Sequence, residues 1–443
     1  MSLIALSRLL HDGPPDQSVV ALRRGQALDF GQFRAAAAAV VADCAPGSRV
    51  VLVCEDGFLF AAGFVGVLLA GGELVLPPNG LPGTLDALAG GYDRLIDDAA
   101  ILTMLGCQSA EVPTPGPIDA GAARVTFFTS GSTGAPKCIT RSLAMLEHEI
   151  AAIDKAFGGL PGDGAVLSTV SHQHLYGLVF RLLWPLLSGR PFHAETLLVW
   201  ETVIAARPGG GVVISSPAHL SRLGGLTPLT EGWRPSAVFS AGAPLSAVDA
   251  LVVRDVLGVL PTEIFGSTES GAVATRRQIV GGEAWTLLPG VTLRVESDDT
   301  ASFASPQVAG WITTGDVVDA TAQGIRFLGR RDGVLKIEGK RVSLAEIENG
   351  LTALKLVDQA AAVLLPGKPA KLAAVVVPSE AGRTLLATEG SFRFGRRLAR
   401  LLASQLEPMG RPKRWRFVSS LPQRHLGKRD LQALAALFAE TMG

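Results

Sequence analysis

The chain of 443 residues has few of the features that mark metal-binding, secreted, membrane or nucleic-acid-binding proteins. Its four cysteines form no CxxC pair and no metal-ligand spacing, so we expect reduced thiols in a cytosolic protein. The formal net charge is zero, which predicts no general attraction to nucleic acid or to anionic membranes. The most apolar run, from Phe58 to Gly72, is too short and too rich in glycine to span a bilayer. The first residues lack a signal-peptide pattern, so we expect a soluble cytoplasmic protein.

Apolar residues, in contrast, are abundant. Hydrophobic residues make up 48% of the chain and charged residues 18%, which indicates large buried cores rather than disorder. The length predicts two or more domains. Predicted strands and helices alternate from residue 18 to residue 76 and again after residue 142. This alternation indicates an α/β fold in which helices flank a parallel sheet.

A loop rich in glycine and hydroxyl groups follows a short apolar strand predicted at residues 125–128, and it reads TSGSTGAPK. Its glycines allow a close approach to a ligand, and consecutive backbone N–H groups with neighbouring hydroxyls form an anion-binding nest. A proline precedes its lysine, so it is not a Walker A loop. We interpret it as a polyphosphate cradle, with a Ser/Gly-rich surface turn as the alternative. The candidate phosphate-binding residues are Thr129, Ser130, Gly131, Ser132, Thr133, Gly134 and Lys137.

This loop resembles the phosphate loop of the AMP-forming adenylating enzymes, which include acyl- and aryl-CoA synthetases, peptide-synthetase adenylation domains and luciferases. Further stretches that match motifs of the family follow in the expected order along nearly the whole chain. The resemblance implies a large N-terminal domain at residues 1–331, in which residues 288–310 form a small β-rich subdomain. It also implies a small, mobile α+β domain at residues 332–443.

Two segments resemble the walls of the family's acyl and adenine pockets. The first carries His172, His174 and Tyr176 just past a predicted strand, where ligands of open α/β sheets gather. The resemblance implies a pocket role for His174 in particular, and a satisfied polar residue is the alternative. The second is the turn AGAPLS, whose small residues leave room for a flat ring. The resemblance implies that Ser240, Gly242 and Ala243 contact adenine.

The stretch PTEIFGSTESG resembles the family's Tyr-Gly-x-Thr-Glu motif. Phe265 replaces the usual tyrosine, so it can stack on adenine beside Gly266 but cannot donate a hydrogen bond. Thr268 offers a hydroxyl to the α-phosphate, and Glu269 offers a carboxylate to Mg²⁺, which favours oxygen ligands. A helix N-terminus with a capping hydroxyl and an acid in its first turn is a compatible structural interpretation.

The region from Trp311 onward resembles the family's ribose site and domain boundary. Asp316 suits the two ribose hydroxyls, and Arg330 could hold the same ribose. A hinge is expected at Asp332 and its glycine neighbour. The resemblance assigns Gly339 to the passage of a pantetheine arm. A capping box, formed by a serine at 343 and a glutamate at 346, opens the next predicted helix.

Lys428 lies near the end of the chain in LPQRHLGKRDL, which matches the family's final motif at Pro422, Gly427 and Lys428. The resemblance assigns catalysis to this lysine, and a solvated charge is the alternative. Together the motifs imply ATP-dependent activation of a carboxylic acid to an acyl-adenylate, with Mg²⁺ and release of pyrophosphate. A pantetheine thiol of CoA or of an acyl carrier protein then takes the acyl group. Catalysis is expected at Lys428, Thr268, Glu269 and His174.

The acid and its acceptor are less closely defined. The compact size and the segment SHQHLYGL resemble ligases of aryl-polyene and xanthomonadin-type pigment pathways, which implies a small aromatic acid. Fatty acids and amino acids remain alternatives, and so does a degenerate nucleotide-binding regulator. Residues 391–430 carry eleven Lys and Arg against two acids, a charge of +9, and this favours an acidic carrier protein over CoA. The sequence defines no oligomeric state.

Overall fold

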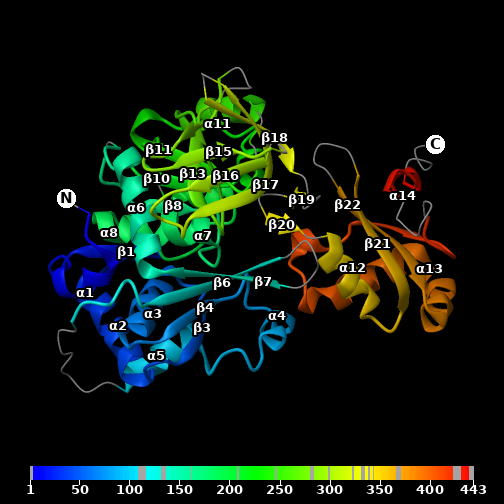
Figure 1. The fold of residues 1–443 in the computed structure, drawn as a ribbon, viewed down its shortest axis with the longest axis horizontal. Coiled ribbons are helices and arrows are strands. Elements are labelled where there is room, and N and C mark those ends of the chain that lie inside the picture. Colours follow the sequence, from blue (N-terminus) through cyan, green and yellow to red (C-terminus); the bar gives the residue numbers. More distant parts are fainter. Residues whose placement is uncertain are drawn as a thin grey trace. The chain divides into compact units, whose positions relative to one another are not determined.

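The computed structural model describes residues 3–107, 116–130, 136–160, 162–206, 209–243, 245, 247–279, 284–297, 300–321, 324–330, 335–337, 340–342, 344–365, 371–422 and 431–438. The chain forms two compact units (Figure 1). The larger unit comprises residues 1–79, 88–129 and 138–331, and the smaller one comprises residues 80–87, 130–137 and 332–443. The smaller unit thus includes two short segments that the sequence-based division assigned to the N-terminal domain. The predicted domains themselves stay predictions.

The first part of the chain builds the N-terminal sheet, with strand order β5-β3-β4-β6-β7. Strands β3, β4, β5 and β6 are parallel, and helices α2, α3 and α5 accompany them (Figure 1). Helix α3 is apolar on all sides and almost wholly buried, and Asp56 caps it by accepting from two backbone N–H groups. The bounds are α2 (Phe30–Asp43), β3 (Arg49–Val53), α3 (Gly57–Leu69), β4 (Glu73–Leu76), β5 (Arg94–Asp97), α5 (Asp98–Gly106), β6 (Arg124–Ser130) and β7 (Pro136–Ser142).

The central sheet has the strand order β14-β13-β12-β11-β10-β8-β9-β1-β2. Its strands from β12 to β1 are parallel, while β13, β14 and β2 are antiparallel to their neighbours. The strands are β1 (Val19–Arg23), β2 (Gln26–Asp29), β8 (Val166–Ser168), β9 (Phe192–His193), β10 (Val212–Ser215), β11 (Ala237–Ala241), β12 (Thr262–Ser267), β13 (Gly271–Arg276) and β14 (Thr286–Leu287).

Helices pack around both of these sheets, and one hydrophobic core, which includes Leu52 and Phe239, joins them. The helices are α1 (Leu9–Asp12), α6 (Leu143–Phe157), α7 (Leu175–Gly177), a π-helix (Leu178–Leu183), α8 (Trp184–Ser188), α9 (Trp200–Ala205), α10 (Pro217–Leu220) and α11 (Ala247–Leu257), with 3-10 turns at Leu6–Arg8 and Glu231–Trp233. The α/β fold class with parallel sheets and flanking helices is therefore confirmed.

Two elements differ from the expectations. Residues 18–43 contain a hairpin of two antiparallel strands before helix α2, and not the simple alternation of strand and helix, because Arg24 and Gly25 both take positive φ, as a two-residue hairpin turn requires. Strand β7 was not expected either. It carries few apolar residues, and its charged Arg141 is buried rather than exposed.

A small antiparallel sheet, β15-β16-β17-β18, completes the larger unit. Its strands are β15 (Thr292–Val295), β16 (Thr300–Ala304), β17 (Trp311–Thr321) and β18 (Gly324–Arg330). Its apolar face shares a core with the hairpin β12–β13, through Phe303, Val318 and Val273 among others. This is the β-rich region expected near residues 288–310, extended to Arg330.

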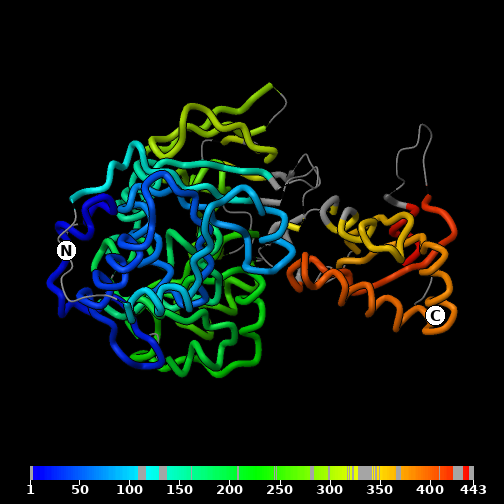
Figure 2. The backbone as a smooth tube through the Cα atoms, turned by 90° about the horizontal axis from the view of Figure 1, so that it is seen from below, coloured from blue at the N-terminus to red at the C-terminus, as the bar shows by residue number. Residues whose placement is uncertain are grey.

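The smaller unit is an α+β structure built on the sheet β21-β22-β23 (Figure 1), and most of its backbone runs from yellow to red in Figure 2. Helix α13 is interrupted at Gly390, which has a φ of +76°. The elements are α4 (Pro82–Ala87), β19 (Leu335–Ile337), β20 (Lys340–Val342), α12 (Leu344–Thr352), β21 (Val357–Leu365), β22 (Lys371–Pro378), α13 (Glu380–Leu401), β23 (Arg414–Phe417) and α14 (Leu431–Ala436), with 3-10 turns at Leu402–Ser404 and Pro408–Gly410. Within the described ranges, no helix is long and apolar enough to cross a membrane.

Candidate active site

The carboxyl ends of neighbouring parallel strands bring eight of the predicted site residues to one edge of the central sheet. Strands β8, β10, β11 and β12 pair in register and end one beside the next. The segment with His174 follows β8, and the turn with Gly242 follows β11. The turn with Thr268 and Glu269 follows β12. This is the edge at which open α/β sheets bind their ligands.

His172 fastens the segment after β8 to the N-terminal sheet. Its Nε2 lies 2.8 Å from the Cys54 carbonyl oxygen, which can only accept, so Nε2 carries the proton. The ring packs 4.4 Å from the Phe60 ring, and burial holds the pKa of His172 well below its usual range, with Arg181 adding to the effect. The adjacent Gln173 donates to the Leu52 and Pro77 carbonyls. These contacts give His172 a structural role.

His174 immediately precedes helix α7 and is partly buried. Tyr176 packs its ring 5.1 Å from that of Phe180, and burial raises the pKa of the Tyr176 phenol well above its usual range, against a weaker opposing effect of the Ser215 backbone. The following π-helix is a rare element that is frequent at functional sites. Tyr176 and Phe180 thus form an aromatic pair close to His174 in the chain, and the pocket role of His174 stays a prediction.

Arg181, on the π-helix, is a fully buried residue that the sequence analysis missed. Its guanidinium donates to the Val170 carbonyl at 3.1 Å, the Ala194 carbonyl at 2.9 Å and the Thr196 hydroxyl at 2.6 Å. Burial lowers its pKa to about 10, so it stays charged at neutral pH. Arg181 thereby ties the loop after β8, at Val170, to the segment after β9, at Ala194 and Thr196. Its position within the apolar stretch LVFRLL could have indicated that this arginine is buried.

The turn after β11 contains the predicted adenine-contacting residues. Gly242 has a φ of +95°, which side-chain-bearing residues rarely adopt. Ser240 is buried, and its hydroxyl has no hydrogen-bond partner within the described part of the chain. The turn is held at Leu245, whose N–H donates to Glu263 at 2.8 Å and whose carbonyl accepts from Gln278 at 2.7 Å. Ala243 lies in the same turn.

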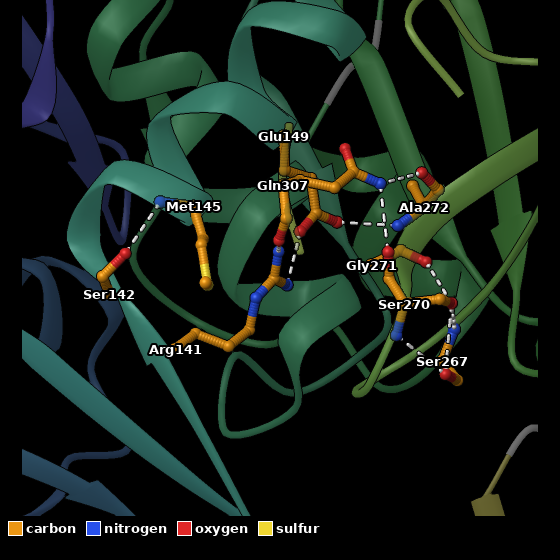
Figure 3. A network of polar contacts seen from close by, with 9 residues as sticks. All are labelled: Arg141, Ser142, Met145, Glu149, Ser267, Ser270, Gly271, Ala272 and Gln307. Carbon is orange, nitrogen blue, oxygen red and sulfur yellow. Dashed lines mark hydrogen bonds and ion pairs between the residues drawn. The ribbon is translucent and has the colours of Figure 1, made fainter. Parts of the chain in front are cut away.

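Thr268 and Glu269 occupy a tight turn between β12 and β13, and both are partly buried. The sequence analysis allowed for a helix N-terminus here. That interpretation is wrong, because the chain reverses directly into an antiparallel strand. The hydroxyls and backbone N–H groups of Ser267 and Ser270 bond to each other across the turn at 3.1–3.2 Å (Figure 3). The turn places Thr268 and Glu269 next to each other in the chain at the end of β12.

Phe265 belongs to β12 and lies in the core between the hairpin and the small antiparallel sheet. Its ring stacks on Phe327 with centroids 3.6 Å apart, and it meets Trp285 edge-on at 5.7 Å. One flank of the ring is therefore occupied by protein. Gly266 follows it at a register shift between β12 and β13. Stacking of Phe265 on adenine stays a prediction.

Asp316 and Arg330, both predicted to hold the ribose, are direct partners in the register of β17 and β18. Asp316 is buried, and its N–H donates to the Thr314 hydroxyl at 3.3 Å. They are fourteen positions apart in the chain, and the hairpin brings their backbones side by side; their ribose role stays a prediction.

The structure describes only some of the remaining predicted site residues. Thr129 and Ser130 end β6, and Lys137 is an exposed residue of β7. The others lie outside the described residues, namely Gly131, Ser132, Thr133, Gly134, Gly339 and Lys428, with the expected hinge at Asp332 and the cap at Ser343.

The side chains near the turn of Glu269 can be compared with the oxygen ligands that Mg²⁺ prefers. Among the residues that the structure describes, no three His, Cys, Asp or Glu side chains form a cluster that could hold a metal ion. Magnesium usually takes one or two carboxylates and completes its shell with substrate phosphates and water. The single, partly exposed carboxylate of Glu269 fits that pattern.

Comparison with known proteins agrees with this arrangement. A family model described as AMP-binding enzyme matches residues 92–316. A 4-coumarate–CoA ligase of Rhodobacter capsulatus is 32% identical over 69% of this chain and 74% of its own. Phenyloxazoline synthase MbtB of Mycobacterium tuberculosis is 28% identical over 97% of this chain and 35% of its own. The fold resembles amide bond synthetase McbA from Marinactinospora thermotolerans, with a TM-score of 0.81 at 20% identity, covering 98% and 100% of the two chains. The predicted resemblance is thus confirmed, and the chain belongs to the AMP-binding enzyme family.

Proposed function

We propose that the protein is an AMP-forming acid–thiol ligase that activates a small aromatic acid and transfers it to a pantetheine thiol. The observation that carries the proposal is the turn of Thr268 and Glu269, held at the sheet edge of a chain in the AMP-binding family. Asp316 and Arg330, which are register partners on β17 and β18, would hold the ribose of the same nucleotide. The predicted enzyme class agrees with the family and with the similarity to a CoA ligase.

The chemistry runs in two balanced steps. A carboxylate oxygen attacks the α-phosphorus of ATP, the bond from that phosphorus to the bridging oxygen breaks, and pyrophosphate leaves. A thiol sulfur then attacks the acyl carbon, loses its proton, and displaces AMP. Because the carboxylate and the triphosphate are both anions, the first step needs positive charge at the site to offset their repulsion. Lys428 and Lys137 would supply them, and Glu269 would hold Mg²⁺, which neutralises the departing pyrophosphate when bound.

The aromatic acid is supported by two observations. Tyr176 and Phe180 form an aromatic pair next to His174, behind the edge of the central sheet. The similar protein of Rhodobacter capsulatus is named for an aromatic acid, 4-coumarate. A fatty acid would need a longer apolar channel, whereas a planar acid suits an aromatic wall.

Exchange of labelled pyrophosphate into ATP tests the function directly. Purified protein with Mg-ATP should exchange the label when coumarate, hydroxybenzoate or another aryl acid is added, and less with fatty or amino acids of equal concentration. A fatty acid that gives the fastest exchange would refute the aromatic assignment. A folded protein that binds ATP and exchanges with no acid would refute the enzymatic function and favour the nucleotide-binding regulator.

For the acceptor, we propose an acyl carrier protein rather than free CoA. The second half of α13 carries Arg393, Arg396 and Arg400 on an exposed face, next to Phe392, which is 77% exposed. The Arg396 guanidinium lies 6.0 Å from the Phe392 ring centre. An aromatic ring framed by cations suits the acidic, partly apolar surface of a protein better than the few phosphates of CoA.

Charge reversal of Arg393 and Arg396 to Glu should slow carrier loading and leave pyrophosphate exchange unchanged. Arg383→Glu, in the first half of the same helix, is the matched control. Loading should also fall steeply with salt, because exposed charges are screened over about 8 Å at physiological ionic strength. Faster transfer to CoA than to carrier proteins would contradict the proposal.

A further inference from the structure

A buried ionic network lies directly behind the turn that carries Thr268 and Glu269. Arg141 of β7 donates to Glu149 of α6 at 2.6 Å, and their side chains are only 2% and 3% exposed. The second terminal nitrogen of Arg141 donates to the Gln307 backbone carbonyl at 2.8 Å. The network therefore joins a strand, a helix and the loop between β16 and β17 (Figure 3).

The network holds the turn on its β13 side. The other Glu149 oxygen accepts from the Ala272 N–H at 2.9 Å. The Gln307 side-chain amide donates to the Ser270 carbonyl at 3.1 Å and to the Ala272 carbonyl at 2.6 Å. Three main-chain groups on the β13 side of the turn are thus fixed by side chains from distant parts of the chain.

Gly271 shows how closely the network approaches the backbone. Its φ is +68°, and a Cβ placed on it would lie 2.7 Å from a Glu149 carboxylate oxygen and 3.1 Å from the Gln307 amide nitrogen. No room is left for a side chain. The position of the backbone next to Glu269 is therefore set by Glu149 and Gln307 and not by the hairpin alone.

We propose that Arg141, Glu149 and Gln307 are positioning residues that set the affinity of the site for the metal–nucleotide complex. The inference deepens the proposed function, since it assigns the turn's ligand groups to the metal–phosphate part of the substrate. Arg141 balances the charge of Glu149 in the protein interior. Glu149 and Gln307 fix the backbone of the turn by hydrogen bonds, and that backbone carries Thr268 and Glu269. Residues that orient a metal ligand without touching the metal commonly change metal affinity 10–100-fold when they are replaced.

Gln307→Met is the cleanest test. It removes the two side-chain hydrogen bonds to the turn, yet it keeps the backbone carbonyl that Arg141 uses and introduces no buried charge. Ser270→Ala is the second variant, because it removes only the hydroxyl that closes the turn. Ile101→Ala, in α5 of the same unit, is the control for a general loss of stability.

Binding of Mn²⁺ with a non-hydrolysable ATP analogue, followed by electron paramagnetic resonance, gives a readout that needs no turnover. Gln307→Met should weaken Mn²⁺ binding at least about tenfold, and Ser270→Ala should weaken it less. Hydrogen exchange of the amides in residues 267–272 should accelerate in both variants. Ile101→Ala should lower the melting temperature and leave both measurements unchanged.

Wild-type Mn²⁺ affinity in Gln307→Met, or an equal loss in Ile101→Ala, would overturn the inference. Pyrophosphate exchange separates it from the proposed function. If no acid supports exchange in any variant while Mn²⁺ binding still falls in Gln307→Met, the positioning role stands and the ligase assignment fails. If exchange proceeds normally with unchanged Mn²⁺ affinity, the ligase assignment stands and the positioning role fails.

Discussion

Replacing Glu263 with alanine should destabilise the larger unit more than almost any other single substitution. Glu263 is 2% exposed and accepts from Arg276 at 2.8 Å and 3.1 Å, from Gln278 at 2.5 Å and from the Leu245 N–H at 2.8 Å. Alanine leaves the Arg276 guanidinium, 13% exposed, without its counter-charge. Breaking a buried pair in this way costs about 3–5 kcal/mol.

The magnitude translates into a measurable shift of the melting temperature. Unfolding entropy is about 2.1 cal/mol/K per residue, so a unit of about 300 residues unfolds with about 0.6 kcal/mol/K. A loss of about 3–5 kcal/mol therefore lowers Tm by about 5–8 °C. Differential scanning calorimetry of Glu263→Ala gives this value.

Asp255→Ala is the control for Glu263→Ala. Asp255 pairs with Arg254 at 2.8 Å, but the two side chains are 62% and 49% exposed, so its loss should cost no more than about 1 kcal/mol. Glu263→Ala should also weaken ATP binding, because Leu245 anchors the turn of Gly242. A Tm within 2 °C of the wild type would refute the reasoning, since it would mean that the cation finds another partner or water.

Two further predictions concern catalysis and pH. Lys428→Ala should abolish adenylate formation but leave thioester formation from a supplied acyl-adenylate largely intact. A bulky residue at Gly339 should instead impair the thiol step more than pyrophosphate exchange. Equal losses in both half-reactions would contradict the assignment of the two residues to different steps. Burial lowers the pKa of His172 and of His193, so the unfolded chain binds protons that the folded protein excludes. Their contribution to the free energy of unfolding is present above the unfolded pKa of about 6.5 and is lost as the pH falls through it toward the lower folded pKa. Thermal melts of the wild type and His172→Gln between pH 7.5 and 5.5 should show a shallower decline in the variant, and identical slopes would exclude His172 as a source.

The sequence by itself determined the family and the alternation of strands and helices. The phosphate loop, the turn with Glu269, and Asp316 with Arg330 could be singled out because each belongs to a short pattern whose residue types suit a ligand, and their roles stay predictions. Phosphate, metal and ribose need particular donors and acceptors, whatever surrounds them.

Tertiary structure alone decided which side chains hold those residues in place. Arg141 bonds to a carbonyl 166 positions away, and Glu149 accepts from an N–H 123 positions away. A charged residue in a sequence is expected to face water, and nothing local shows that a partner will arrive from a distant loop. Burial of such groups becomes favourable only when the packed core brings donor and acceptor together and excludes water. The same reason explains why the helix allowed at Thr268 is a hairpin turn, since its conformation is set by Glu149 and Gln307 as well as by the hydrogen bonds between Ser267 and Ser270.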